Sequence, residues 1–183
     1  MTDQVSPLTT AQVLAIQPDQ YGWRKLPDGR EVKIAANAII ADSAWASVGA
    51  WARVGAWASV GDGARVGARA RVGDGANIPT SKDLMTIDFA GSRLDTLSAQ
   101  LNVYPIIIST GCFRQKTIDE FEQAVTKSHG NNQWAAEYRA IVAMLRAVQY
   151  VRFPELIPAK VANVKPTKKT AAKVSGTAKK VLA

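Results

Sequence analysis

Aliphatic and small residues recur every six positions through the first half of the chain. From Val48 there are five consecutive hexads, VGAWAR, VGAWAS, VGDGAR, VGARAR and VGDGAN, followed by Ile78 and Pro79. Each hexad begins with Val and has Ala at its fifth position. The segments IAANAI and IADSAW, from Ile34 and Ile40, fit the same template. Ile40 and Val48 are eight residues apart, however, so the pattern predicts a corner or an inserted turn between them.

This period resembles that of the hexapeptide-repeat superfamily over residues 34–79. In that superfamily, each hexad forms one face of a triangular prism and three hexads close one coil of a left-handed parallel β-helix. The resemblance implies that the Val and Ala positions line the interior and that residues eighteen apart stack, with Arg53 under Arg71 and Trp51 under Arg69. The glycine after each valine is expected to let the backbone turn a corner.

Three tryptophans follow the same spacing. Trp45, Trp51 and Trp57 are six residues apart, which places them on three different faces and predicts that all three point outward. A ring of exposed tryptophans is unfavourable on a monomer. The pattern therefore favours a homotrimer, which is also the usual assembly of the hexapeptide-repeat superfamily.

Conventional elements flank the repeats. Residues 21–34 predict a hairpin with a Pro-Asp-Gly turn, and residues 80–95 predict a loop and connector. Alternating apolar residues from Leu97, followed by an apolar run after Pro105, predict two strands.

Two helices are predicted after these strands. Thr117 and Glu120 form a capping box, and Gly130 follows the expected end near residue 128. Asn132 is a candidate N-cap for a second helix. The apolar face of that helix contains Trp134, Tyr138, Ile141, Leu145 and Val148.

The predicted fold class is therefore mainly β, with a short left-handed parallel β-helix, a small ββαα domain and a disordered basic tail. We predict an N-terminal segment with a hairpin at 1–33, the β-helix at 34–79, the ββαα cap at 80–158 and the tail at 159–183. Within the cap, STGCFRQKTIDEFEQAV and SHGNNQWAAEYRAI resemble segments of uncharacterised phage and prophage proteins. That resemblance, which covers about residues 109–141, implies a mobile-element origin.

Charge is concentrated at the C-terminus. The chain has a formal net charge of +8, and the seven lysines of residues 159–183 account for all but one unit of it. This stretch has no acidic or aromatic residue, so it lacks the surface to form a core. It resembles the lysine- and alanine-rich tails of DNA-compacting proteins, which bind phosphates by counterion release. The candidate nucleic-acid contacts are Lys165, Lys168, Lys169, Lys173, Lys179 and Lys180; a tail that only increases solubility is the alternative.

Other function classes are constrained by what the sequence lacks. The chain has one cysteine, Cys112, and one histidine, His129, which leaves no zinc cluster, so no metal is expected. It has no apolar run of membrane-spanning length and no pattern typical of a signal peptide. We therefore expect no membrane partner, and a location in the host cytoplasm or within a phage particle.

Candidate ligand or partner contacts are the outward residues Arg53, Arg65, Arg69, Arg71, Trp51 and Trp57. Arginine grips phosphates, and tryptophan stacks on bases or sugars. Packing within a trimer is the alternative for each of these residues.

Three functions stay open at this point. The first is a non-catalytic, trimeric structural or interaction protein of phage type whose tail contacts nucleic acid or another anionic partner. The second is a trimeric binder of a small anionic ligand such as a nucleotide. The third, implied by the superfamily, is an acyltransferase that uses coenzyme A and His129 as base; the position of His129 at a helix end and the short repeat favour the first two, for which no cofactor is expected.

Overall fold

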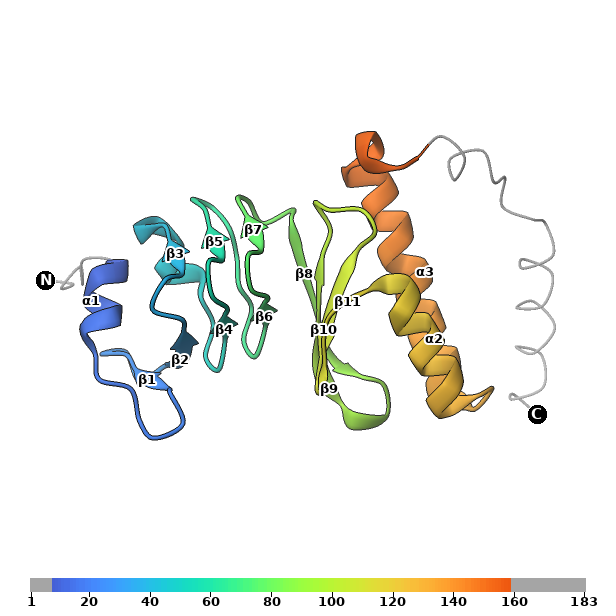
Figure 1. Ribbon diagram of the computed structural model, residues 1–183, viewed down its shortest axis with the longest axis horizontal. Helices are drawn as coiled ribbons and strands as arrows, with labels where there is room; N and C mark the ends of the chain where they lie inside the picture. The colour runs from blue at the N-terminus through green and yellow to red at the C-terminus, as the bar shows by residue number, and fades with distance from the viewer. Residues whose placement is uncertain (1–7, 159–183) are drawn as a thin grey trace, which may run out of the picture.

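The computed structural model describes residues 8–158 (Figure 1). The lysines of the predicted tail lie outside this range. The elements, in chain order, are α1 (Thr10–Ala15), β1 (Arg24–Lys25), β2 (Glu31–Ile34), β3 (Ile39–Ile40), β4 (Arg53–Val54), β5 (Ser59–Val60), β6 (Arg71–Val72), β7 (Asn77–Ile78), β8 (Leu84–Ala90), β9 (Asp95–Gln100), β10 (Ile107–Thr110), β11 (Phe113–Thr117), α2 (Ile118–His129) and α3 (Gln133–Arg152). Short 3₁₀ turns cover Asp42–Ser47, Gly91–Arg93 and Pro154–Leu156.

The repeat region, residues 34–79, contains two-residue strands, and each pairs in parallel with the strand three hexads further along the chain. Arg53 pairs with Arg71 and Ser59 with Asn77, both eighteen residues apart, as the sequence predicted. Upstream the spacing is twenty, with Lys33 opposite Arg53. The two extra residues belong to the 3₁₀ turn at Asp42–Ser47, which confirms the predicted insertion.

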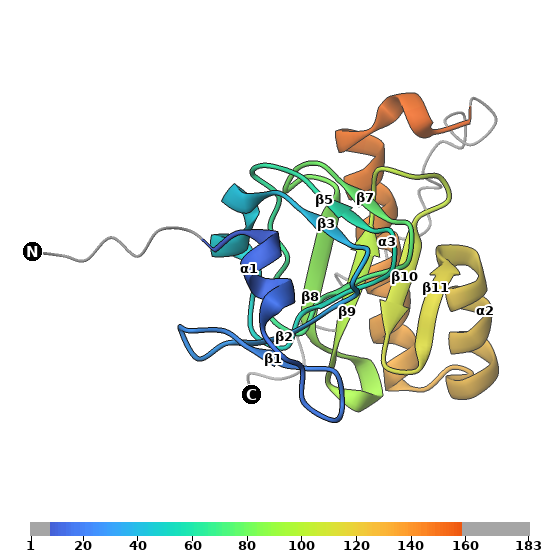
Figure 2. The same ribbon diagram turned by 60° about the vertical axis from the view of Figure 1, so that its left-hand side comes forward.

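The interior of the repeat region is built as the hexads predicted. The first-position valines and fifth-position alanines are buried, from Val48 and Ala52 to Val72 and Ala76, and Ile78 closes the series. α1 packs its buried Val13 against the N-terminal end of this core (Figure 2). The first and fifth positions of every hexad each add one apolar side chain to a continuous stack. The region therefore forms a core without long strands.

Trp45 does not point outward as predicted. It is 1% exposed, and its Nε1 donates to Thr10 Oγ1 at 3.1 Å. The insertion explains this, because Trp45 lies in the 3₁₀ turn and its side chain covers the end of the core beneath α1. Trp51 and Trp57 are 47% and 75% exposed, as predicted.

The glycine at the second position of each hexad has a different role from the predicted one. The positive φ angles fall at the fourth position, at Trp51, Trp57, Gly63, Arg69 and Gly75. A Cβ on Gly49 would lie 2.4 Å from the backbone nitrogen of Ala68. The second position therefore requires glycine because adjacent turns of chain approach too closely for a side chain.

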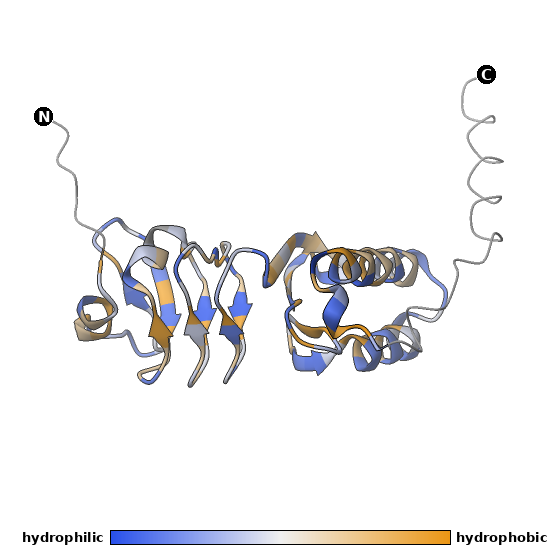
Figure 3. Cartoon of the chain, turned by 90° about the horizontal axis from the view of Figure 1, so that it is seen from above, coloured by the Kyte–Doolittle hydropathy of each residue, from blue (hydrophilic) through white to orange (hydrophobic). Residues whose placement is uncertain are grey.

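The C-terminal unit is an antiparallel sheet with strand order β11-β10-β9-β8, with α2 and α3 on its face away from the repeat region (Figure 3). In β9, Leu97 and Ala99 pack against the helices. Thr96 and Ser98 alternate with them and are also buried. Ser98 Oγ accepts a hydrogen bond from Arg71 N–H at 2.9 Å, so the polar face of the sheet rests on the last turn of the repeat region.

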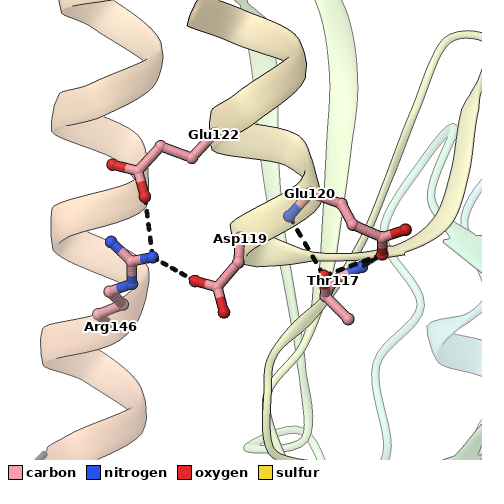
Figure 4. A network of polar contacts seen from close by, with 5 residues as sticks. All are labelled: Thr117, Asp119, Glu120, Glu122 and Arg146. Carbon is pink, nitrogen blue, oxygen red and sulfur yellow. Dashed lines mark hydrogen bonds and ion pairs between the residues drawn. The ribbon is translucent and has the colours of Figure 1, made fainter.

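Both predicted helix starts are confirmed. Thr117 caps α2 in a capping box with Glu120, and Asn132 Oδ1 accepts from Ala135 N–H at the start of α3. Arg146 of α3 bridges to α2, donating to Asp119 at 2.7 Å and to Glu122 at 2.9 Å (Figure 4). Burial lowers the pKa of Arg146, but the two hydrogen bonds outweigh it and the net effect is a raised pKa. This pair of contacts joins the two helices at their exposed side.

The predicted fold class, a left-handed parallel β-helix with a ββαα cap, is wrong. The described residues form separate sheets of mixed direction and three α-helices, with no closed or solenoid sheet: a four-stranded sheet β1-β2-β4-β6, a three-stranded sheet β3-β5-β7 and the antiparallel sheet. The hexads yield only two-residue strands, and the third set of pairings is a single bridge between Val48 and Val66. The predicted hairpin is confirmed. Its strands β1 and β2 pair antiparallel at one edge of the first sheet.

The predicted loop at residues 80–95 is likewise wrong. Residues 80–95 contain strand β8, which pairs with β9 over Leu84–Ile87 and again at Ala90. β11 was also not predicted as a strand. Polar residues interrupt both segments because one face of this sheet packs against the repeat region and not into an apolar core.

Candidate functional site

Three arginines from distant parts of the chain meet at the junction between the repeat region and the antiparallel sheet. Arg53 and Arg71 lie opposite each other on β4 and β6, about 4.8 Å apart in the backbone as in any sheet. Arg114 is on β11, where the neighbouring Gln115 contacts Gly73 and Asp74 directly after β6. We call the pocket that these residues line the arginine pocket.

The arginine pocket has a volume of about 150 Å³. Its other lining residues are Gly73, Asp74, Ser109 and Gln115. Gln115 N–H donates to Ser109 Oγ at 3.1 Å, and its Nε2 donates to the backbone oxygen of Asp74 at 2.8 Å. The first bond lies within the hairpin, and the second joins the hairpin to the repeat region at the pocket.

Positive charge in the pocket is not neutralised by ion pairs. None of the ion pairs formed among residues 8–158 includes Arg53, Arg71 or Arg114. The one carboxylate in the lining, that of Asp74, accepts from Ala56 N–H at 2.8 Å. Arg71 is oriented by donation from Nη1 to the backbone oxygen of Gly111, also 2.8 Å. The pocket therefore presents three guanidinium groups against one carboxylate that is already hydrogen-bonded.

The titration of Arg71 reflects this crowding. Burial is the largest cause that lowers its pKa, and the positive charge of Arg53 is the next. Arg114 lowers it further, whereas Asp95 opposes the shift. A cation whose pKa is lowered by like charges is stabilised by any anion that enters among them.

An aromatic pair lies beside the pocket. The rings of Trp23 and Trp51 meet edge to face with centroids 5.2 Å apart. The guanidinium of Arg53 lies 4.9 Å from the centroid of Trp23. Trp51 is about half exposed, so a planar ligand has an open face on which to stack.

The predicted contact residues separate into two groups. Arg53, Arg71 and Trp51 lie at or beside the arginine pocket. Arg65, Arg69 and Trp57 are exposed but do not line it. Arg65 has the same hexad position as Arg53 and Arg71. It lies next to the Val48–Val66 bridge, however, and not in the sheet that contains Arg53 and Arg71.

Arg114 and Trp23 were not predicted as contact residues. Arg114 belongs to the segment GCFRQK, whose placement near the end of β6 depends on the unpredicted strand β11. Trp23 lies in the predicted hairpin, and no spacing in the sequence indicates that its ring meets that of Trp51.

His129 and Cys112 line a second cavity, of about 310 Å³, within the C-terminal unit. His129 is the last residue of α2, as predicted, and its ring lies 5.7 Å from that of Tyr138. No sequence pattern indicates that the single histidine and the single cysteine share a cavity. Neither residue lines the arginine pocket.

Residues 8–158 contain no cluster of three or more His, Cys, Asp or Glu side chains placed to hold a metal ion. No helix within this range has the length and apolar character needed to cross a membrane.

Comparison of the chain with protein-family models, with curated proteins and with solved structures finds no match. The resemblances to hexapeptide-repeat proteins and to phage proteins therefore stay predictions from the sequence.

Proposed function

We propose that this protein is a non-catalytic interaction protein that binds nucleic acid, with backbone phosphates held in the arginine pocket. The observation that supports this is the convergence of Arg53, Arg71 and Arg114, without an ion-pair partner, on one pocket. A pocket of about 150 Å³ has room for a phosphate group, and it opens to the surface, so the sugar and base of a polymer can remain outside it.

The aromatic pair supports the same function. A base that follows a bound phosphate lies within reach of the exposed face of Trp51, and stacking on an aromatic ring is tolerant of sequence. Lys33 continues the register of Arg53 and Arg71 along the first sheet, which extends the line of cations. The proposal thus favours a single strand, whose bases are free to stack.

The predicted tail lysines complete the proposal. In this interpretation they add contacts that are independent of sequence, and the pocket positions the strand. We further propose a homotrimer and a phage or prophage origin, with a location in the host cytoplasm or in a phage particle. Three pockets and three tails per particle would make binding multivalent.

The test is fluorescence anisotropy of a labelled oligothymidylate bound to the full chain at several salt concentrations. Arg53→Gln and Arg114→Gln are each expected to weaken binding about three- to tenfold and to reduce the salt slope by about one ion. Arg65→Gln is the matched control, because it removes the same charge from the same hexad position outside the pocket. It is expected to change binding less than twofold.

A second variant separates pocket from tail. Replacing Lys165, Lys168, Lys169, Lys173, Lys179 and Lys180 with glutamine is expected to weaken binding while leaving the effect of Arg53→Gln in place. If the tail variant no longer binds the oligonucleotide, and Arg53→Gln in the otherwise native chain binds it with unchanged affinity, the pocket is not the nucleic-acid site. Competition by a mononucleotide at equal strength would instead favour the small-ligand function.

A further inference from the structure

The cavity of about 310 Å³ in the C-terminal unit is separate from the arginine pocket and is built from four elements. The turn between β8 and β9 contributes Arg93, the β10–β11 hairpin contributes Cys112 and Phe113, α2 contributes Phe121 and His129, and α3 contributes Tyr138. Its volume is within the range of small-molecule sites in proteins.

Apolar and aromatic side chains line the inner part of this cavity. Phe113 and Phe121 meet edge to face with centroids 5.2 Å apart, and Phe121 and Tyr138 do so at 5.4 Å. Val125 and Ala124 complete this surface from α2. Such a lining favours an apolar group of about the size of one aromatic ring over water.

Polar groups gather at the other part of the lining. Arg93 Nη1 lies 3.6 Å from Cys112 Sγ, and the His129 imidazole faces the ring of Tyr138. None of the ion pairs among the described residues includes Arg93. A Cβ on Gly111, next to Cys112, would lie 3.5 Å from Arg93 Nη1 and 3.6 Å from Asp95 Oδ2, so the Asp95 carboxylate lies near the Arg93 guanidinium without forming an ion pair with it.

The turn that carries Arg93 is held in a defined conformation. Gly91 N–H donates to Glu137 Oε1 at 2.6 Å, and a Cβ on Gly91 would lie 1.9 Å from Tyr138 Cζ. Leu94 follows in a left-handed conformation, with φ of 49°. This turn therefore fixes the backbone from which the Arg93 side chain extends to Cys112.

We propose that this cavity binds a small carboxylate with an apolar body, the apolar part between Phe113, Phe121 and Val125 and the carboxylate near Arg93 and His129. Charge complementarity favours this occupant over a neutral one, because the guanidinium of Arg93, which has no ion-pair partner among the described residues, adjoins the apolar part of the cavity. The site is independent of the proposed nucleic-acid function.

Cys112 is a direct reporter of the site, since it is exposed, lines the cavity and is the only cysteine in the chain. The first measurement is the rate at which iodoacetamide alkylates Cys112 in the full chain. Saturating 3-phenylpropionate is expected to slow alkylation about tenfold, whereas 3-phenylpropanol at the same concentration has a smaller effect. Equal rates with and without 3-phenylpropionate would overturn the proposal.

Calorimetric titration gives the second measurement. 3-Phenylpropionate is expected to bind at least about tenfold more tightly than 3-phenylpropanol, because a hydrogen bond to a charged group contributes more than one to a neutral group. Arg93→Gln is expected to remove that difference. Arg65→Gln is the matched control, because Arg65 is exposed and lines neither this cavity nor the arginine pocket.

A filling variant checks the location of the ligand. Ala124 is half-buried on α2, so Ala124→Phe is expected to occupy the cavity and abolish binding of both probes. Ser128→Phe, at an exposed position of the same lining, gives a second test with less risk to the fold. Unchanged affinity in both folded variants, or equal affinity for the acid and the alcohol, would contradict the proposed site.

Discussion

At the scale of single residues, the hexads contain two kinds of glycine. The second-position glycines have no room for a side chain, as at Gly49, where the neighbouring turn of chain is in contact. The fourth-position glycines, such as Gly63 with φ of 71°, have open space but a left-handed backbone. Trp51, Trp57 and Arg69 adopt that same backbone, which shows that the fourth position tolerates a side chain at the cost of strain.

This difference predicts the order of two substitutions. Gly49→Ala is expected to lower the free energy of unfolding by more than about 2 kcal/mol, because its Cβ would lie 2.4 Å from Ala68 N and the backbone must move. Gly63→Ala is the control, and its expected cost is about 1 kcal/mol of backbone strain. Urea denaturation measures both. A cost for Gly49→Ala no larger than that for Gly63→Ala would show that the turns separate freely.

At the scale of elements, the capping box of α2 couples helix stability to pH. Thr117 N–H donates to Glu120 Oε2 at 2.8 Å, and Glu120 N–H donates to Thr117 Oγ1 at 3.2 Å. The backbone hydrogen bond from Thr117, followed by the one from its side chain, lowers the pKa of Glu120 below its ordinary value of 4.5. Because the folded pKa is the lower one, this stabilisation is present above pH 4.5 and is lost as the pH falls through the folded pKa.

Thr117→Ala is therefore expected to lower the free energy of unfolding by about 1 kcal/mol at neutral pH, as for other N-caps. Part of this difference is expected to be lost as the pH falls through the folded pKa of Glu120, because protonation weakens the hydrogen bond from Thr117 Oγ1 to Glu120 Oε2, whereas the backbone N–H of residue 117 remains in the variant. Chemical denaturation across this pH range measures the effect. Thr126→Ala, in the same helix and exposed, is the control and is expected to show no such pH dependence. A Thr117→Ala effect that is constant with pH would exclude the coupling.

At the scale of the whole molecule, the exposed apolar surface of the repeat region bears on assembly. Trp57 is 75% exposed and Ile39 is 68% exposed. They lie on adjacent turns of chain, since Trp57 N–H donates to Asn37 Oδ1 at 3.4 Å and Ile39 pairs with Ser59. Trp51, by contrast, packs on Trp23. Trp57 and Ile39 are therefore the best candidates for a contact between copies of the chain.

The proposed homotrimer predicts that Trp57→Glu dissociates the assembly, because a charge at a buried contact has no partner. Sedimentation equilibrium of the native chain is expected to give three times 19.6 kDa, and that of the variant a lower mass. Phe89→Glu is the matched control: Phe89 is 68% exposed but lies on β8, outside the repeat region. A native chain of monomer mass would refute the trimer. A trimer that persists in Trp57→Glu would show that Trp57 is not at the interface between copies.

The sequence by itself determined what depends on local periodicity. The buried valines and alanines, the eighteen-residue register, the inserted turn and both capped helices were predicted correctly, because each follows from residues within one repeat or one helical turn. The predicted fold class failed because the same short period does not say whether two-residue strands join into one continuous sheet. The predicted exposure of Trp45 failed because the insertion changes which way a side chain points.

Only the tertiary structure decided the candidate sites. The arginine pocket needs Arg71 to meet Ser98 and Gly111, which are 27 and 40 residues away along the chain. Strands β8 and β11 have polar residues on the face that packs against the repeat region, so their patterns do not predict buried strands. Cys112 and His129 share a cavity for the same reason: packing between the β10–β11 hairpin and α2 brings them together, and no local pattern encodes such a contact between elements.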